Sequence, residues 1–241
     1  MAIGRDTTFT WLGHSGVEIA TSGGRTILVD PWFGNPKSTR TQEQQAACDV
    51  LLVTHGHFDH FDADTVALAK RLHPVMPCIH ELSLYLGEAV GDAAEVIGMN
   101  QGGTVETKGV RVTMVPAVHS SGDTLGAAEV RYFGQPVGFV VELENGFRVY
   151  HAGDTVAFGD MALIRDLHAP DLAMLPIGGH FTMDPREAAI AVGLLGVRDV
   201  LPIHWGTFPI LAGTPAALQE AIDARGLKAT VHAWLPGQSV S

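Results

Sequence analysis

The chain has 241 residues, enough for one large α/β domain or two small ones, and its 46% apolar and 17% charged residues indicate a folded globular protein. The formal net charge of -11 argues against broad nucleic-acid binding, because such binding needs Lys and Arg to replace phosphate counterions. The first residues lack the apolar region of a signal peptide, and no apolar run approaches the roughly 18 residues of a membrane span. We therefore expect a cytoplasmic protein without stable membrane association.

The first part of the chain predicts a small antiparallel meander. Strand-like runs at residues 8–12, 17–20 and 25–30 are separated by glycine-containing turns. A loop then extends from the end of the third strand to about residue 46, and loops of this length often form pocket walls.

The next stretch carries the strongest signal. Residues 50–53 form a short apolar run typical of a strand that is buried on both faces. Directly after it, His55, His57, Asp59 and His60 lie within six positions. Imidazole and carboxylate are ligands that suit Zn, Mn, Fe or Ni.

This spacing suits two metal ions better than one. Two metals about 3.5–4 Å apart can hold one hydroxide between them. The alternative is a polar loop whose histidines are coincidental, but burying three imidazoles beside a carboxylate would cost several kcal/mol without a compensating partner. A pair of cations provides that partner.

After this segment, Asp62 or Asp64 is expected to cap a helix that continues to residue 72. The rest of the chain alternates between strands and helices at both ends, with antiparallel-looking strands between them. The expected strands are residues 75–80, 94–98, 104–106, 110–115, 126–133, 137–143, 147–151, 171–177, 199–204 and 229–234. The expected helices are residues 81–90, 160–168, 184–195 and 214–225. Because no linker separates the two halves, we expect a single domain over residues 1–241.

Three more candidate ligands stand at the ends of expected strands: His119, Asp154 and His204. Ligands at strand ends are held on rigid elements while one side of the site stays open to substrate. A shared site built with His55–His60 is therefore expected.

The order His55-x-His57-x-Asp59-His60, His119, Asp154, His204 resembles the metal motif of the metallo-β-lactamase superfamily. The resemblance implies an α/β, four-layer αββα sandwich with the site along one edge of its two sheets. It also assigns the ligands of each metal: His55, His57 and His119 for the first, Asp59, His60 and His204 for the second, with Asp154 bridging them. The commonest zinc β-lactamases carry a cysteine where Asp154 stands, which argues against β-lactam hydrolysis.

Residues 11–15, 30–33, 176–185 and 204–208 resemble a branch of small metal-dependent hydrolases of this superfamily. That branch is similar to the L-ascorbate-6-phosphate lactonases and, more distantly, to the phospholipase D enzymes that hydrolyse N-acyl-phosphatidylethanolamine. The resemblance implies a chemistry and leaves the substrate open.

Other polar residues could support this site. His14 and His180 follow glycines near strand ends, and we expect them to contact substrate. The alternative for each is a surface histidine or one that supports a metal ligand from outside. The resemblance puts Asp30 beneath the metal loop, where its carboxylate could orient a ligand histidine through the second ring nitrogen. His151 is left out of the ligand set, because alternation along its strand can turn it away.

We expect a binuclear metal-dependent hydrolase that cleaves an ester, lactone or phosphoester bond of a small molecule. A hydroxide held between two divalent ions would be the nucleophile, with Zn as the first expectation and Mn, Fe or Ni also compatible. Asp59 is the expected catalytic residue, because it could orient the nucleophile and pass its proton to the leaving group. No nucleophile elbow offers another mechanism.

Three rivals remain. One is a phosphodiesterase of the phospholipase D-like branch. Another is a non-hydrolytic di-iron redox protein, although such relatives usually carry a glutamate where His57 stands. The third is a metal-binding protein without activity. A small-molecule substrate and no nucleic-acid partner are expected, and the sequence leaves homo-oligomerisation open.

Overall fold

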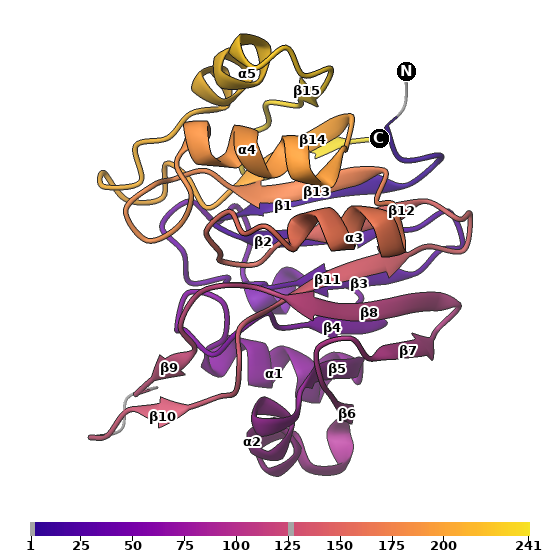
Figure 1. The fold of residues 1–241 in the computed structure, drawn as a ribbon. Helices are drawn as coiled ribbons and strands as arrows, with labels where there is room; N and C mark the ends of the chain where they lie inside the picture. The colour runs from indigo at the N-terminus through magenta and orange to yellow at the C-terminus, as the bar shows by residue number, and fades with distance from the viewer. Residues whose placement is uncertain (1–2, 125–127) are drawn as a thin grey trace.

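The computed structural model describes residues 3–124 and 128–241, and these form two mixed β-sheets that pack face to face with helices outside (Figure 1). The first sheet has its strands in the order β16 (Ser239–Val240), β1 (Thr8–Gly13), β2 (Gly16–Ala20), β3 (Thr26–Val29), β4 (Val50–Leu52), β5 (Val75–Ile79) and β6 (Glu95–Met99). The β1–β2–β3 part is antiparallel, as the sequence predicts, and β3 to β6 are parallel.

The second sheet is ordered β15 (Thr230–Val231), β14 (Asp199–Ile203), β13 (Leu172–Pro176), β12 (Arg148–His151), β11 (Val137–Glu142), β8 (Val110–Pro116) and β7 (Thr104–Thr107). Strands β12 to β15 are parallel and the others are antiparallel. A separate pair, β9 (Gly122–Asp123) and β10 (Arg131–Tyr132), projects from the body at the lower left of Figure 1.

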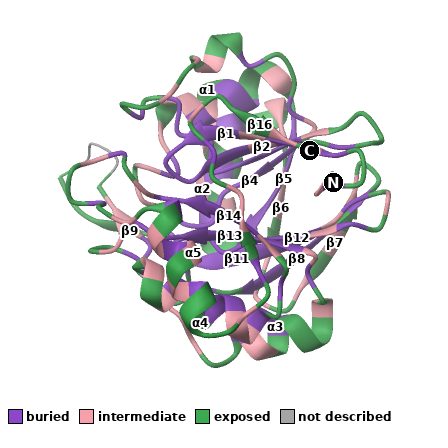
Figure 2. Ribbon diagram, turned by 90° about the horizontal axis from the view of Figure 1, so that it is seen from above, coloured by how far each residue is buried: buried purple, intermediate pink, exposed green. Residues whose placement is uncertain are grey.

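Helices form the two outer layers. On the first sheet lie α1 (Ala63–Leu72) and α2 (His80–Val90), and on the second lie α3 (Met161–His168), α4 (Pro185–Leu195) and α5 (Pro215–Ala224). Short 3-10 turns occur at η1 (Gln42–Gln44) and η2 (Gly91–Ala93). Figure 2 shows α1 on one side of the strands, with α3 and α4 on the opposite side. The αββα sandwich expected from the sequence is confirmed.

Strand β13 shows why its sequence is apolar at every position. Leu172 and Met174 join the core between the two sheets, whereas Ala173 and Leu175 pack under α3, α4 and α5. Successive side chains of a strand point to opposite faces, so a strand in the middle of a four-layer fold needs apolar residues on both.

Helix starts follow the capping signals. Asp62, one of the two expected caps, accepts a hydrogen bond of 3.0 Å from the Thr65 amide at the start of α1. Asp184 does the same for the Glu187 amide at 2.8 Å, with Pro185 in the first turn of α4. None of the helices in the described part of the chain is long and apolar enough to cross a membrane.

Several expected elements were wrong in extent. Part of the strand expected at 126–133 falls on residues 126 and 127, which lie outside the described residues, and of the remainder only Arg131–Tyr132 is a strand. Val130 is 72% exposed, because this arm has no core to pack against. The strand expected at 229–234 is limited to Thr230–Val231 at the sheet edge, and His80 begins α2 instead of ending β5.

Candidate metal centre

The seven expected ligand side chains come together at one end of the sandwich, where the two sheets meet. His55, His57, Asp59 and His60 lie on the loop between β4 and α1. The other three follow strands of the second sheet: His119 follows β8, Asp154 follows β12 and His204 follows β14. The sequence separates these segments widely, and the packing of the two sheets brings them into one cluster.

Asp154 is at the centre of this cluster. Its Oδ2 atom lies 3.1 Å from His204 Nε2, 3.3 Å from His60 Nε2 and 3.7 Å from His119 Nε2. The residue is only 2% exposed. One buried carboxylate oxygen is therefore shared by imidazoles from both sheets.

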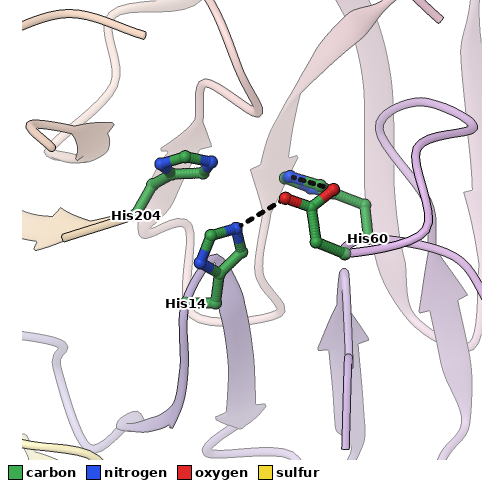
Figure 3. A group of neighbouring side chains, drawn as sticks. His14, His60 and His204 are labelled. Carbon is green, nitrogen blue, oxygen red and sulfur yellow. Dashed lines mark hydrogen bonds and ion pairs between the residues drawn. The ribbon is translucent and has the colours of Figure 1, made fainter. Parts of the chain in front are cut away.

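The cluster divides into two groups that could each hold an ion. His55, His57 and His119 form one, and Asp59, His60 and His204 form the other together with His14, with the ligand atoms of each group within 4.8 Å of one another. A third group by the same criterion, His55, His60 and Asp154, overlaps both. Figure 3 shows His14, His60 and His204 converging from three separate segments. The first two groups correspond to the division that the resemblance implies, except that His14 joins the second and that Asp154 appears only in the group that overlaps both. Metal binding by these residues stays a prediction.

Asp30 and Thr54 lie beneath the ligand loop and fix the orientation of two imidazoles. Asp30 Oδ1 accepts the Thr54 amide at 2.8 Å, and Oδ2 accepts both the Thr54 hydroxyl at 2.7 Å and His60 Nδ1 at 2.8 Å. Because the Thr54 hydroxyl hydrogen goes to Asp30, its oxygen accepts from His55 Nδ1 at 3.0 Å. The Nε2 atoms of His55 and His60 therefore face the cluster, as metal ligation requires.

Burial governs the charge of most of these imidazoles. It lowers the pKa of His55 far below the usual value and also lowers the pKa of His57 and of His119. Neutral imidazoles of this kind are ready to bind cations without first releasing a proton.

The pKa values of His60 and Asp154 are set by neighbouring charges and not by burial alone. Burial disfavours a charge on either His60 or Asp154, but their mutual attraction and the charge of Asp30 raise the pKa of His60 well above its usual value. The charges of His204 and His60 likewise overcome burial and hold the pKa of Asp154 well below its usual value. Without a metal, a proton on His60 balances these carboxylates, and a divalent ion would take over that role.

His14 is placed deeper than a substrate contact alone requires. Its Nε2 lies 3.0 Å from Asp59 Oδ2 and its Nδ1 lies 3.0 Å from Thr207 Oγ1. Burial, followed by the charge of His204, lowers the pKa of His14 to about 4. The neutral ring can donate to Asp59 while it accepts from Thr207, so it holds one oxygen of this carboxylate in place.

The other predicted substrate contact, His180, lies elsewhere. It is exposed, its ring packs against that of Phe181 at 4.5 Å, and it is absent from the residues that line the cavity over the cluster. His14 does line that cavity. Of the two histidines, the structure therefore brings only His14 to the cluster.

His151 is occupied by the backbone. Its Nε2 donates to the carbonyl of Ser15 at 3.0 Å, and its Nδ1 accepts the amide of Gly153 at 3.2 Å. Both ring nitrogens are therefore engaged away from the cluster.

Sequence reasoning missed the hydroxyl groups around the site. Thr54 and Thr207 orient histidines, Ser120 Oγ lies 3.3 Å from His57 Nε2, and Ser121 Oγ accepts the Gly56 amide at 3.1 Å. All four are next to, or within three positions of, a candidate ligand in the sequence. Adjacency is the one signal that could have found them, and it is weak because Ser and Thr are common.

The donor set fits a pair of divalent ions. Two buried atoms at the cluster, Asp154 Oδ1 and His60 Nε2, make no hydrogen bond within the described residues, and His60 Nε2 has only its ion-pair contact of 3.3 Å with Asp154 Oδ2. Buried polar atoms are normally satisfied, so such atoms in one place need an explanation. Imidazole nitrogens mixed with carboxylate oxygens suit Zn, Mn, Fe or Ni.

Comparison with known proteins agrees with this geometry. The family model described as "Beta-lactamase superfamily domain" matches residues 25–205, a span that includes all seven candidate ligands. The chain belongs to the metallo-β-lactamase superfamily.

Relatives in this superfamily cover the full length of the chain. A UPF0173 metal-dependent hydrolase from Koribacter versatilis is 45% identical over 96% of this chain and 97% of its own length. A UPF0173 metal-dependent hydrolase from Rubrobacter xylanophilus is 44% identical, with 97% and 96% covered. The structure of Igni18, a metallo hydrolase from the archaeon Ignicoccus hospitalis, superposes with a TM-score of 0.84 at 34% identity, over 97% of each chain. The 241-residue chain is therefore a metal-dependent hydrolase of the UPF0173 family.

Proposed function

We propose that this protein hydrolyses an ester, lactone or phosphoester bond of a small substrate at a centre of two divalent metal ions. The observation that carries the proposal is the position of Asp154 Oδ2, 3.1–3.7 Å from imidazoles of both ligand groups. A single buried carboxylate placed in this way suits a bridging ligand.

Two divalent ions at this position would supply a water acidified toward neutral pH and would polarise the bond to be cleaved. The chain's own residues would hold the ions: His55, His57 and His119 on one side, Asp59, His60 and His204 on the other. Asp30 keeps the Nε2 atom of His60 directed at the site through its hydrogen bond to Nδ1. Rigid support of this kind lets the cluster keep its geometry during turnover.

Asp59 is the group that could move a proton. Its side chain is 16% exposed, whereas the side chain of Asp154 is 2% exposed, so Asp59 faces the cavity. Burial would raise the pKa of Asp59, but the hydrogen bond from His14 and the charge of His60 together hold it below its usual value. An ionised Asp59, held by His14 at one oxygen, can accept the proton of the attacking water and deliver it to the leaving group.

The test is to remove and restore the metal. The purified protein should contain close to two divalent ions by elemental analysis, and chelation should abolish hydrolysis of a panel of esters, lactones and phosphoesters. Adding back Zn, Mn, Fe or Ni one at a time should restore activity and identify the preferred ion.

Two variants separate the roles of the residues. His57→Ala removes a candidate ligand and should reduce the metal content. Asp59→Asn keeps an oxygen that can bind the ion but loses the proton acceptor, so it should lower kcat by about 10²–10⁴. His168→Ala, on helix α3, is the matched histidine control and should behave as wild type. Full activity in metal-free protein would disprove the proposal, and iron content together with oxygen consumption would favour the di-iron redox alternative.

A further inference from the structure

The cavity above the candidate metal centre has a volume of about 600 Å³, which is in the range of small-molecule sites. Its floor is made of candidate metal ligands, and its walls are mostly apolar. The wall residues are Phe58, Phe181, Phe208, Ile210 and Leu211. A molecule that reaches the metals therefore lies against these side chains.

These apolar residues come from three loops that converge on the floor. Phe58 is on the ligand loop, Phe181 is between β13 and α4, and Ile210 is between β14 and α5. Phe58, Phe181 and Ile210 are 52%, 57% and 49% exposed, and exposed apolar side chains that are grouped around one cavity mark a ligand-binding site. Trp32 lies beside this wall, with ring centroids 5.6 Å from Phe58 and 6.2 Å from Phe208.

The charge of the lining points to the same kind of ligand. None of the fourteen described residues that line the cavity is Lys or Arg, whereas Asp59, Asp123 and Asp154 are carboxylates. Asp123 Oδ2 accepts the amide of Phe58 at 3.0 Å, so negative charge extends to the wall. A phosphate or carboxylate held away from the metals would find no cationic partner there, and proteins normally bind such groups with Arg or Lys.

We propose that the apolar wall is a subsite for an uncharged acyl group, and that the substrate is a carboxylic ester or lactone with an apolar chain and no distant phosphate. This inference rests on the proposed function and narrows it to one bond type. In the reaction, water adds its oxygen to the acyl carbon, and the bond from that carbon to the alcohol oxygen breaks. The water proton passes to the departing oxygen, so the products are a carboxylic acid and an alcohol.

Substrates with one leaving group test the idea. The metal-loaded protein is assayed with 4-nitrophenyl acetate, butyrate and hexanoate, and with 4-nitrophenyl phosphate and bis(4-nitrophenyl) phosphate. A fully buried methylene is worth roughly fourfold in kcat/KM. For an acyl chain that is partly buried, we expect about a tenfold rise or more from acetate to hexanoate, with both phosphate compounds as poor substrates.

Variants of the wall locate the effect. Phe181→Ala and Ile210→Ala should flatten the dependence of kcat/KM on chain length. Leu167→Ala removes a leucine that is 73% exposed on α3 and is not part of the cavity, and it should keep the wild-type dependence.

A binding measurement separates this inference from the proposed function. 4-Nitrophenyl hexyl ether, which cannot be hydrolysed, should bind wild-type protein by calorimetry with or without metal and should bind Phe181→Ala more weakly. If the ether binds in this way but metal-loaded protein hydrolyses no ester, lactone or phosphoester, the subsite stands and the proposed hydrolysis is wrong. If the phosphate compounds are preferred, or if chain length has no effect, the subsite proposal is wrong and hydrolysis stands.

Discussion

The two halves of the candidate metal centre are built in different ways. The half from the first sheet is one loop, His55 to His60, with Asp30 and Thr54 hydrogen-bonded directly beneath it. The half from the second sheet consists of His119, Asp154 and His204, each from a different strand end. Local hydrogen bonds therefore set the first half, whereas the register and packing of a whole sheet set the second.

The halves join where the chain permits very close approach. Gly153 lies against Thr54, and a Cβ atom at this position would come within 2.8 Å of Thr54 Cβ and of the Val137 carbonyl. Its φ of +61° also favours glycine. The amide of Val137 donates to the carbonyl of Thr54 at 3.0 Å, a direct backbone link between the two sheets. The geometry of the site therefore depends on this junction between the sheets as well as on the ligands themselves.

The largest effect is expected for Asp154→Asn, because one oxygen of Asp154 lies 3.1–3.7 Å from imidazoles of both halves. The amide keeps the shape and removes a negative charge that would balance the bound cations. Metal affinity should fall by more than the roughly 10–100-fold lost with an outer hydrogen-bond partner. Equilibrium dialysis with elemental analysis measures this, and the exposed Asp166→Asn on α3 is the control. Retention of two ions with wild-type affinity would contradict the central role of Asp154.

Asp30→Asn should weaken the first half alone. An asparagine tolerates the positive φ of +46° at this position, so the backbone is expected to be preserved. The amide cannot accept hydrogen bonds from Thr54 and His60 as fully as the carboxylate does. We expect about 10–100-fold weaker metal binding and a loss of roughly 1–3 kcal/mol in the free energy of unfolding.

Chelator competition and urea unfolding measure the two effects of Asp30→Asn, with Asp166→Asn again as the control. If Asp30→Asn weakened metal binding as strongly as Asp154→Asn does, the two halves would not be independent.

The smallest expected effect is a pH dependence of the metal-free protein. Burial lowers the pKa of His14, His55, His57, His119 and His151 in the folded state. Between these values and the unfolded value of about 6.5, the unfolded chain binds more protons, so this stability is fully present above pH 6.5 and is lost as pH falls.

His60 and the two acidic ligands leave this window undisturbed. The raised pKa of His60 affects stability only above about pH 6.5, and the lowered pKa values of Asp59 and Asp154 affect it only below about pH 4. Thermal unfolding in the presence of a chelator should therefore show a melting temperature that decreases from pH 6.5 to pH 4.5. A constant or rising melting temperature over this range would be inconsistent with neutral buried imidazoles.

The same division explains what the sequence could predict. The loop from His55 to His60 is visible as a contiguous pattern of ligands. The strand before it follows from an apolar run, and the helix after it follows from the capping residue Asp62. The second half could be expected only as strand ends and assigned through the resemblance, because pattern does not give the register between sheets.

The position of His14 depends on tertiary contacts. It reaches the cluster because its turn between β1 and β2 meets the segment after β14, where the amide of His204 donates to its carbonyl at 2.8 Å. Strand β16 was missed for a related reason, since two residues carry no periodic signal and pair with β1 only in the finished fold.

The carbonyl of His14 also accepts the indole Nε1 of Trp11 at 2.9 Å. That indole is stacked between Trp205 and Trp234, at centroid distances of 5.2 and 5.8 Å, and Trp205 directly follows His204. Three of the four tryptophans in the chain are thus stacked next to the centre, with Trp11 hydrogen-bonded to His14 and Trp205 adjacent to His204 in the sequence. Their emission offers an unlabelled optical readout of how the site assembles.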